Sequence, residues 1–500
     1  MKKLTLISLA ALALAGCNVE TNNGSTPTAT PAVTATPTVS PTPTTGSVAS
    51  LSFIDSNLQH CVEATGVEMI RDLTSLTCIN QGISDASDIG ELFSLQTLNL
   101  RHNPLTRINV ENMALTTLDV SNIAGEGQLT SISLANMEQL TWLDVSGNKL
   151  RSLSAPQSAD LSEVYFNNNQ IATVSFQANG QLRVLHGEGN GLESIIVANG
   201  PLTNVDLSNN KLNDIDFPQP YSLRYADLSN NKFIDFPDWS INAERDYTRD
   251  LETLNLSDNS IDSIALPKVV ETLILDGNNF TAWAPSEANS TLTTLSMDNN
   301  KLESITLPDG VEDVSLANNS LSSLLVPTSV VSLDISQNSF TALDLVNNTN
   351  MRALNVADNG FDRFDFPTMP AGLTSLNIAR NNFIAANTNR FANLTDLTVD
   401  GNALTALNVD FNTELVSLSA EATTLSDLVL TENEKLRTIN LTNNLFASVN
   451  PLNNAEGLTL NTSQRYTTVE LSQNPLPEKE ITELNNLNID TLVVDANSDL

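Results

Sequence analysis

A short apolar pattern, L-x-x-L-x-L-x-x-N-x-L, recurs along most of this chain. It is clearest at 202–212, which reads LTNVDLSNNKL, and it returns at 251–261, 292–302, 394–404 and 436–446. Successive copies begin about twenty residues apart, the spacing of a solenoid in which each turn is one supersecondary unit. A unit this small cannot bury its apolar side alone, so it must stack on neighbouring units. The pattern therefore predicts one elongated repeat domain rather than several globular ones.

The copies are registered by their first apolar position. These positions are Leu73, Leu95, Leu115, Leu140, Leu161, Leu182, Leu202, Leu223, Leu251, Val270, Leu292, Val311, Val330, Met351, Leu373, Leu394, Leu415, Leu436, Tyr466 and Ile489. Alternate residues of a strand point to opposite faces. In the clearest copy, Val205 and Leu207 should therefore face the core. Their neighbours Asn204, Asp206 and Ser208 should face solvent.

From Leu73 to the C-terminus this pattern resembles the leucine-rich repeat family. The resemblance implies a mostly β solenoid with a parallel β-sheet on its concave face, short extended or 3₁₀ returns and small helical caps. The asparagine of each repeat lies at a corner facing the core, where a polar group is tolerated only if it is hydrogen-bonded. We therefore predict a structural asparagine ladder, formed by Asn103, Asn148, Asn169, Asn190, Asn210, Asn231, Asn259, Asn278, Asn300, Asn319, Asn338, Asn359, Asn381, Asn402, Asn444 and Asn474.

The first residues have the organisation of an export signal. Two lysines precede an apolar run at 4–15 that is too short to span a bilayer, and the segment ends in Leu-Ala-Gly-Cys at 14–17. This ending resembles a bacterial lipobox, which implies a lipoprotein signal peptide at 1–17 and lipid attached to Cys17. The alternative is an ordinary secretory peptide with an incidental cysteine. If the organism is Gram-negative, Asn18, where an aspartate would signal inner-membrane retention, favours the outer membrane or cell surface.

The remaining boundaries follow composition. Residues 18–50 are rich in Thr, Pro, Ala and Ser, which cannot build a core, so they predict an extended, disordered spacer. We expect an N-terminal helical cap at 51–72, leucine-rich repeats at 73–476, and a C-terminal cap with a short helix and a final strand at 477–500. A loop inserted at 235–250 carries Trp239 and Tyr247.

The N-terminal cap has a second resemblance. An amphipathic stretch at 52–66 predicts a short helix that covers the open end of the first repeat, and similar caps precede the repeats of internalin-like bacterial surface proteins. With Cys17 used by lipid, two cysteines remain in an exported chain. Together these observations predict a disulfide between Cys61 and Cys78. Two buried thiols are the alternative.

Acidic residues dominate the charge. The chain has 58 Asp and Glu against 23 Lys and Arg, a net charge of −35 at pH 7. Because no basic stripe is visible, nucleic acid is excluded as a general partner. The histidines His60, His102 and His186 have no spacing that resembles a nucleophile–base pair or a zinc motif. The sequence therefore predicts no enzyme, cofactor or metal centre, and leaves basic proteins, cations and neutral glycans as partners.

Most outward strand positions hold Thr, Ser, Asn or Asp, but one region differs. Large rings occupy outward positions in neighbouring turns at Trp142, Tyr165, His186 and Tyr225. Carboxylates surround them at Asp144, Glu163, Glu188, Asp206 and Asp227. Rigid aromatic side chains supply contact area at low entropic cost, which is why Trp and Tyr are common in binding hot spots. These residues form the candidate ligand-binding site, with scattered surface aromatics as the alternative.

The aspartates could also bind an ion. Asp206 and Asp227 fall in one column on neighbouring turns, as do Asp119 and Asp144. Like charges so placed repel each other, and calcium could screen them. Because no aspartate-rich calcium loop is present, solvated carboxylates are the favoured interpretation.

These patterns predict a lipid-anchored cell-envelope protein that binds a protein partner through its concave strand face. The internalin resemblance implies adhesion or host contact, although fold alone does not fix function. Aromatic rings beside carboxylates also suit sugars, so binding of an envelope polysaccharide is an alternative. A structural spacer without a specific ligand is another.

Overall fold

The computed structural model describes residues 46–111, 113–134, 136–198, 200–215, 222–235, 251–264, 269–285, 291–363, 371–450 and 456–495. The chain divides into two units, Met1–Thr45 and Gly46–Leu500, and all described residues belong to the second. The expected signal peptide, Cys17 and residues 18–45 of the spacer lie outside the described residues, as do 496–500, Trp239 and Tyr247.

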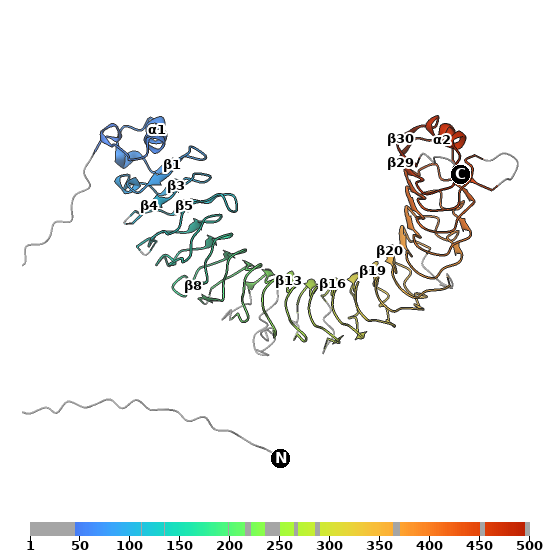
Figure 1. Ribbon diagram of the computed structural model, residues 1–500. Helices are drawn as coiled ribbons and strands as arrows, with labels where there is room; N and C mark the ends of the chain where they lie inside the picture. Colours follow the sequence, from blue (N-terminus) through green and yellow to red (C-terminus); the bar gives the residue numbers. More distant parts are fainter. Residues whose placement is uncertain are drawn as a thin grey trace, which may run out of the picture. The chain divides into compact units, whose positions relative to one another are not determined.

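The second unit is a parallel β-solenoid (Figure 1), which confirms the predicted fold class. Its main sheet has 20 strands, each paired in parallel with the strand of the adjacent turn. The strands are β1 (Ser75–Thr77), β3 (Thr97–Asn99), β5 (Thr117–Asp119), β6 (Trp142–Asp144), β7 (Glu163–Tyr165), β9 (Val184–His186), β11 (Asn204–Asp206), β12 (Tyr225–Asp227), β13 (Thr253–Asn255), β14 (Thr272–Ile274), β16 (Thr294–Ser296), β18 (Asp313–Ser315), β19 (Ser332–Asp334), β20 (Ala353–Asn355), β21 (Ser375–Asn377), β23 (Asp396–Thr398), β25 (Ser417–Ser419), β27 (Thr438–Asn440), β29 (Tyr466–Glu470) and β30 (Ile489–Val493).

Burial alternates along most of the short strands of the main sheet because one face meets the core. In β11 the middle residue, Val205, is fully buried, while Asn204 and Asp206 are half-exposed on the opposite face of the sheet. The expectation that Ser208 faces solvent is wrong. Its side chain is only 5% exposed, because its hydroxyl donates a 2.7 Å hydrogen bond to Asp206 Oδ1 and folds back onto the turn.

The returns are short and mostly extended. Some form two-stranded parallel ladders: β2 (Asp85–Ala86) with β4 (Arg107–Ile108), β8 (Thr173–Phe176) with β10 (Ser194–Val197), β15 (Ala282–Trp283) with β17 (Ser304–Ile305), β22 (Ala386–Asn387) with β24 (Leu407–Asn408), and β26 (Leu428–Val429) with β28 (Leu458–Thr459). Within the described residues, 3₁₀ helices include η1 (Val48–Ser50), η2 (Ile70–Asp72) and η3 (Ile89–Glu91). Within the described part of the chain, no helix is long and apolar enough to cross a membrane.

Helix α1 (Ser56–Ala64) covers the N-terminal end of the solenoid. Its residues Leu58 and Val62 are fully buried, and a disulfide joins Cys61 to Cys78, as predicted. The compact unit begins at Gly46 rather than at residue 51, because Val48 is buried and its N–H donates to the Glu68 carbonyl.

Asp55 organises this cap. As the N-cap of α1 it accepts hydrogen bonds from the backbone N–H groups of Asn57 and Leu58, at 2.9 and 3.2 Å. Its other oxygen accepts from the backbone N–H and the hydroxyl of Ser84, at 2.8 and 3.0 Å. One carboxylate therefore ties the start of the helix to the first repeat.

At the C-terminal end, helix α2 (Glu478–Asn485) precedes the last strand, β30. Leu484 is fully buried, and Ile489 and Leu492 of the strand pack against the core while remaining half-exposed. The last turn therefore closes the core with a helix and a partly exposed strand.

Each predicted ladder asparagine bridges two turns. Asn278 donates from Nδ2 to the carbonyls of Leu256, Leu275 and Asp276, at 2.9, 3.1 and 3.2 Å. Its Oδ1 accepts from the Ile261 N–H at 2.9 Å. All the remaining asparagines of the predicted ladder make equivalent contacts.

A second set of buried asparagines lies on the returns, and the sequence analysis missed it. Each stands three residues before the first apolar position of a repeat and donates to carbonyls of the preceding turn. The set comprises Asn179, Asn348, Asn412 and Asn433. That spacing is visible in the sequence and could have identified them.

Candidate functional site

The candidate ligand-binding site lies on five adjacent strands, β6, β7, β9, β11 and β12. Their register forms two outward columns. The first strand positions are Trp142, Glu163, Val184, Asn204 and Tyr225, and the third positions are Asp144, Tyr165, His186, Asp206 and Asp227. The one remaining predicted residue, Glu188, lies two residues beyond β9.

Three of the four predicted rings form a continuous run. The ring centroids of Trp142 and Tyr165 are 5.7 Å apart in a tilted arrangement. Those of Tyr165 and His186 are 5.1 Å apart, edge to face. Both separations lie in the range of favourable aromatic pairs. Tyr225 is separated from this run by β11, so the structure does not bring all four rings together.

The polar atoms of the rings are fixed by the strand face itself. The Tyr165 hydroxyl donates to Glu163 Oε2 at 3.0 Å. Burial, this hydrogen bond and the charges of Glu163 and Asp144 raise the pKa of Tyr165 to about 12. His186 Nε2 lies 2.8 Å from Asn204 Oδ1. These contacts hold the rings in place without covering them, because each ring stays half-exposed.

Tyr225 has similar surroundings at the other end of the site. Burial and the charges of Asp227 and Asp206 raise its pKa to about 12. Its hydroxyl donates to Asp227 Oδ2 at 3.4 Å, so it remains a protonated donor at neutral pH.

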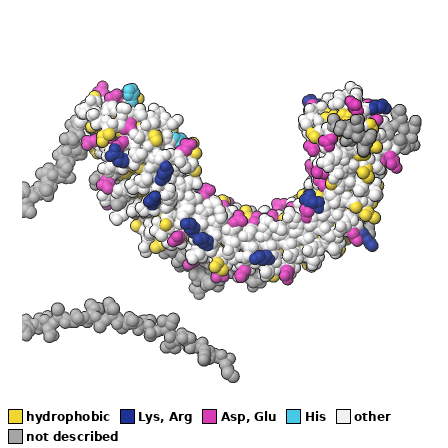
Figure 2. Space-filling model, in the orientation of Figure 1, with side chains coloured by type: hydrophobic (Ala, Val, Ile, Leu, Met, Phe, Trp, Pro, Cys, Tyr) yellow, Lys and Arg dark blue, Asp and Glu magenta, His cyan; other side chains and the backbone are white. Residues whose placement is uncertain are grey.

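The pKa values of two carboxylates of the site are shifted by burial and by neighbouring charges. Burial, opposed by hydrogen bonds from Ser146 and reinforced by the charge of Asp119, raises the pKa of Asp144. Burial and the charges of Asp206 and Asp227 raise the pKa of Glu188. Among the described residues, no Lys or Arg forms an ion pair with any carboxylate of the site. Figure 2 shows acidic side chains along the inner edge of the arc.

The aspartates also have a structural task that the sequence analysis missed. Asp144 Oδ1 accepts a hydrogen bond from the Ser146 N–H at 2.9 Å. Asp206 and Asp227 likewise accept from the backbone N–H of the residue two positions later. Asn255 fills this role in β13, accepting from the Ser257 N–H at 3.1 Å. Asp and Asn side chains commonly accept a hydrogen bond from the backbone N–H two residues later. The spacing Asp/Asn-x-Ser in the sequence therefore predicts this turn.

Tyr165 and His186 occupy the same column but cannot cap the turn. In their turns the preceding repeat supplies the acceptor. The Asn167 N–H donates to Ser146 Oγ at 3.2 Å, and the Glu188 N–H donates to Asn167 Oδ1 at 3.0 Å. The rings therefore occupy a position that holds a capping Asp or Asn in many other turns. A neighbouring turn supplies the acceptor here, as it also does after Ser296, Ser315 and Ser419.

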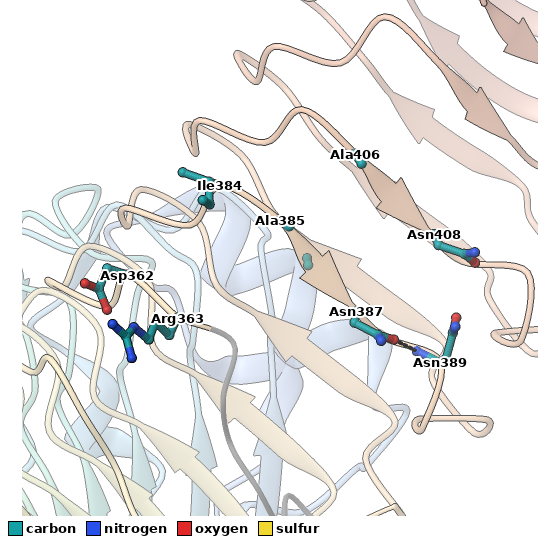
Figure 3. Close-up of a pocket in the computed structure, with 9 residues that line it drawn as sticks. Asp362, Arg363, Ile384, Ala385, Asn387, Asn389, Ala406 and Asn408 are labelled. Atoms are coloured by element: carbon teal, nitrogen blue, oxygen red, sulfur yellow. Dashed lines mark hydrogen bonds between the residues drawn. The ribbon is translucent and has the colours of Figure 1, made fainter.

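A hollow of about 490 Å³ lies on the return side, away from the strand face (Figure 3). It is lined by Asp362, Arg363, Ile384, Ala385, Ala386, Asn387, Asn389, Ala406 and Asn408. The Asn389 N–H donates to Asn387 Oδ1 at 3.2 Å. Its lining of alanines and amides has no aromatic ring and a single opposed pair of charges. It therefore offers less binding chemistry than the strand face.

Comparisons with known proteins agree with this architecture. Residues 94–115 match the family model described as Leucine Rich Repeat. Lumican from Coturnix japonica is 28% identical over 202 residues, which are 38% of this chain and 53% of lumican. The chain thus spans about half the length of the curated relatives it matches.

Two bacterial structures share the solenoid. YopM from Yersinia enterocolitica superposes with a TM-score of 0.67 at 22% identity, covering 88% of this chain and 94% of YopM. The functional domain of InlJ from Listeria monocytogenes, which includes a cysteine ladder, gives a TM-score of 0.54 at 22% identity, covering 80% and 82%. At these identities the likeness shows the fold alone. The recurring sequence pattern and the parallel solenoid that it builds are consistent with a leucine-rich repeat fold.

Proposed function

We propose that this protein binds a protein partner through its concave strand face, centred on the run Trp142–Tyr165–His186. One observation carries the proposal: three rings on adjacent turns contact one another in series, in a face whose other outward positions are mostly small and polar. Leucine-rich repeat proteins generally mediate protein–protein interactions, and their fold typically serves as a non-enzymatic scaffold. A rigid aromatic cluster on such a scaffold has the chemistry of a binding hot spot.

Glycan binding remains the second candidate, favoured by the rings themselves, because sugars stack on aromatic faces. The carboxylates weigh against it, since a neutral ligand leaves their charge uncompensated. A spacer without a ligand would leave the aromatic run without a role.

The proposed setting is the bacterial cell envelope. Lipid attached to Cys17 would anchor the chain, and the Thr/Pro-rich segment at 18–45 would hold the solenoid away from the membrane. An internalin-like cap is supported by α1 and the disulfide that attaches it to the first repeat. Adhesion at the cell surface or outer membrane is consistent with these features.

Anchoring is tested by fractionation of cells that express Cys17→Ser. The wild type should incorporate labelled fatty acid and sediment with membranes, and the variant should be soluble and unlabelled. A variant that remains in the membrane pellet would show that the lipoprotein assignment is wrong.

Partner binding is tested by photo-crosslinking in intact cells. A photoreactive amino acid at Val184, in the first column between Glu163 and Asn204, should capture a partner protein. The matched control is the same probe at Asp313, which holds the first position of β18 outside the site. The double variant Trp142→Ala/Tyr165→Ala should lose the captured partner while keeping its fold by circular dichroism. Equal capture by the double variant would show that the aromatic run is incidental.

A further inference from the structure

We infer that this site anchors an arginine side chain of an extended segment of the partner. The inference rests on the proposed function and specifies its chemistry. It starts from four side chains on two adjacent strands: Trp142 and Asp144 on β6, and Glu163 and Tyr165 on β7. The register pairs Trp142 with Glu163 and Asp144 with Tyr165.

These four positions form a square with alternating chemistry. The two rings occupy one diagonal, with centroids 5.7 Å apart, and the two carboxylates occupy the other. The sides of such a square measure about 4.8 Å between strands and about 7 Å along each strand. The two ring centroids lie closer together than the corners of the diagonal, so a ligand over the square rests against both rings, between the positions of the two carboxylates.

A guanidinium group fits this square better than other side chains. It is planar, stacks on aromatic rings and presents five donors that match carboxylates. A lysine ammonium would satisfy the charge but not the stacking geometry. A sugar would stack on the rings but leave both carboxylates, which have no ion-pair partner among the described residues, without a counter-charge.

A second acidic group lies further along the same face. Asp206 and Asp227 pair in register on β11 and β12, with Tyr225 beside them and Glu188 on the preceding turn. Three strand spacings separate this group from the first square, which is about 14 Å. An extended segment covers that distance in about four residues. A segment that crosses the strands would therefore present basic residues at positions i and i+4.

The probe is a fluorescein-labelled peptide, GGRGSGRGG, titrated against the full chain by fluorescence anisotropy at two ionic strengths. Its control replaces both arginines with citrulline, which has nearly the same shape and no charge. The citrulline peptide should bind at least tenfold more weakly, about 1.4 kcal/mol, and the lysine version should lie between the two. Added salt should weaken the arginine peptide, because charge attraction is screened. Equal affinities for the arginine and citrulline peptides would overturn the inference.

Charge-removing variants distinguish binding at this site from attraction by the overall negative charge of the protein. Asp144→Asn and Glu163→Gln each remove one charge without changing side-chain size, and together they should weaken the arginine peptide at least tenfold. An asparagine makes the equivalent capping contact in another turn, at Asn255, so Asp144→Asn should keep the fold. The control Asp298→Asn removes the same charge beyond β16, and should change affinity less than twofold. An equal effect of Asp298→Asn would show that only the overall field attracts the peptide.

Failure of this inference is distinguishable from failure of the proposed function. Suppose that the partner captured at Val184 is lost with Trp142→Ala/Tyr165→Ala but unaffected by Asp144→Asn/Glu163→Gln. The concave face then binds protein, and the arginine anchor is wrong. If nothing is captured and neutral oligosaccharides bind the aromatic run, both proposals fail and the glycan alternative is established.

Discussion

Asn167 Oδ1 accepts a 3.0 Å hydrogen bond from the backbone N–H of Glu188, one turn further along the solenoid. In ten of the 20 strands of the main sheet, an Asp or Asn at the outward third position makes that contact within its own turn. In this turn His186 stands two residues before Glu188. Its side chain does not accept from the Glu188 N–H, which donates to Asn167 instead. The aromatic run therefore depends on hydrogen bonds that pass from one repeat to the next.

Asn167→Ala should destabilise the protein by about 1 kcal/mol, because the Glu188 N–H loses its acceptor in a half-buried turn. Urea unfolding followed by circular dichroism would measure the loss. The matched control is the exposed Asn213→Ala, which should be near neutral. Equal midpoints for the two variants would mean that solvent replaces the lost bond.

Asp144→Asn should stabilise the protein at pH 7. Burial, reinforced by the charge of Asp119, raises the folded-state pKa of Asp144. A carboxyl group with a raised pKa contributes most to stability below its unfolded pKa, near 3.9, and this contribution is lost as pH rises through the folded pKa. The melting temperature of Asp144→Asn should therefore exceed that of the wild type at pH 7 and approach it near pH 3.

The backbone contact of Asp144 provides the matching control. Asp144→Ala removes the same charge and also the acceptor for the Ser146 N–H. It should be less stable than Asp144→Asn at both pH values. If the two variants melt together, the capping hydrogen bond makes no net contribution.

The repeat predicted the fold because its apolar positions repeat at one spacing, and each inward residue such as Val205 lies in register with its neighbours. The same register aligns the outward positions of neighbouring turns, so the sequence alone could place Trp142, Tyr165 and His186 on one face. The same register separates Tyr225 from the other rings, because the turn of Asn204 and Asp206 lies between His186 and Tyr225. The contacts between neighbouring rings could not be predicted, because they depend on side-chain conformation. The capping by Asn167 was also missed, since it joins residues of different turns.

Asn278→Ala should cost about 1–3 kcal/mol in the free energy of unfolding, because the substitution leaves buried backbone groups of two turns without partners. Its side chain is buried and contacts Leu256, Leu275 and Ile261. Chemical denaturation against Asn213→Ala measures the difference. A loss no larger than that of Asn213→Ala would mean that the ladder is not a source of stability.

Removing the disulfide should loosen the N-terminal cap. Cys61 and Cys78 are separated by 17 residues, and closing a loop of that size is worth about 3 kcal/mol in the chain-entropy model. Repeat solenoids are stabilised mainly by contacts between neighbouring units, so the loss should be local. Hydrogen exchange of the double variant Cys61→Ser/Cys78→Ser should quicken in α1 and β1 and remain unchanged in β16. Equal exchange rates in α1 and β1 of the wild type and the double variant would contradict this prediction.

Acid should weaken the same cap through Asp55. Burial alone would raise the pKa of Asp55, but hydrogen bonds from Ser84, Leu58 and Asn57 outweigh burial and hold the pKa below its ordinary value. A depressed carboxyl pKa contributes stability above the unfolded pKa of about 3.9, and this stability is lost as pH falls through the folded value. Hydrogen exchange in α1 should therefore quicken, relative to β16, as pH falls below 4. Asp55→Asn should show faster exchange in α1 at pH 7 and a much smaller change with acid, because asparagine has no charge to lose. If α1 in wild type and variant respond equally to acid, another group controls the cap.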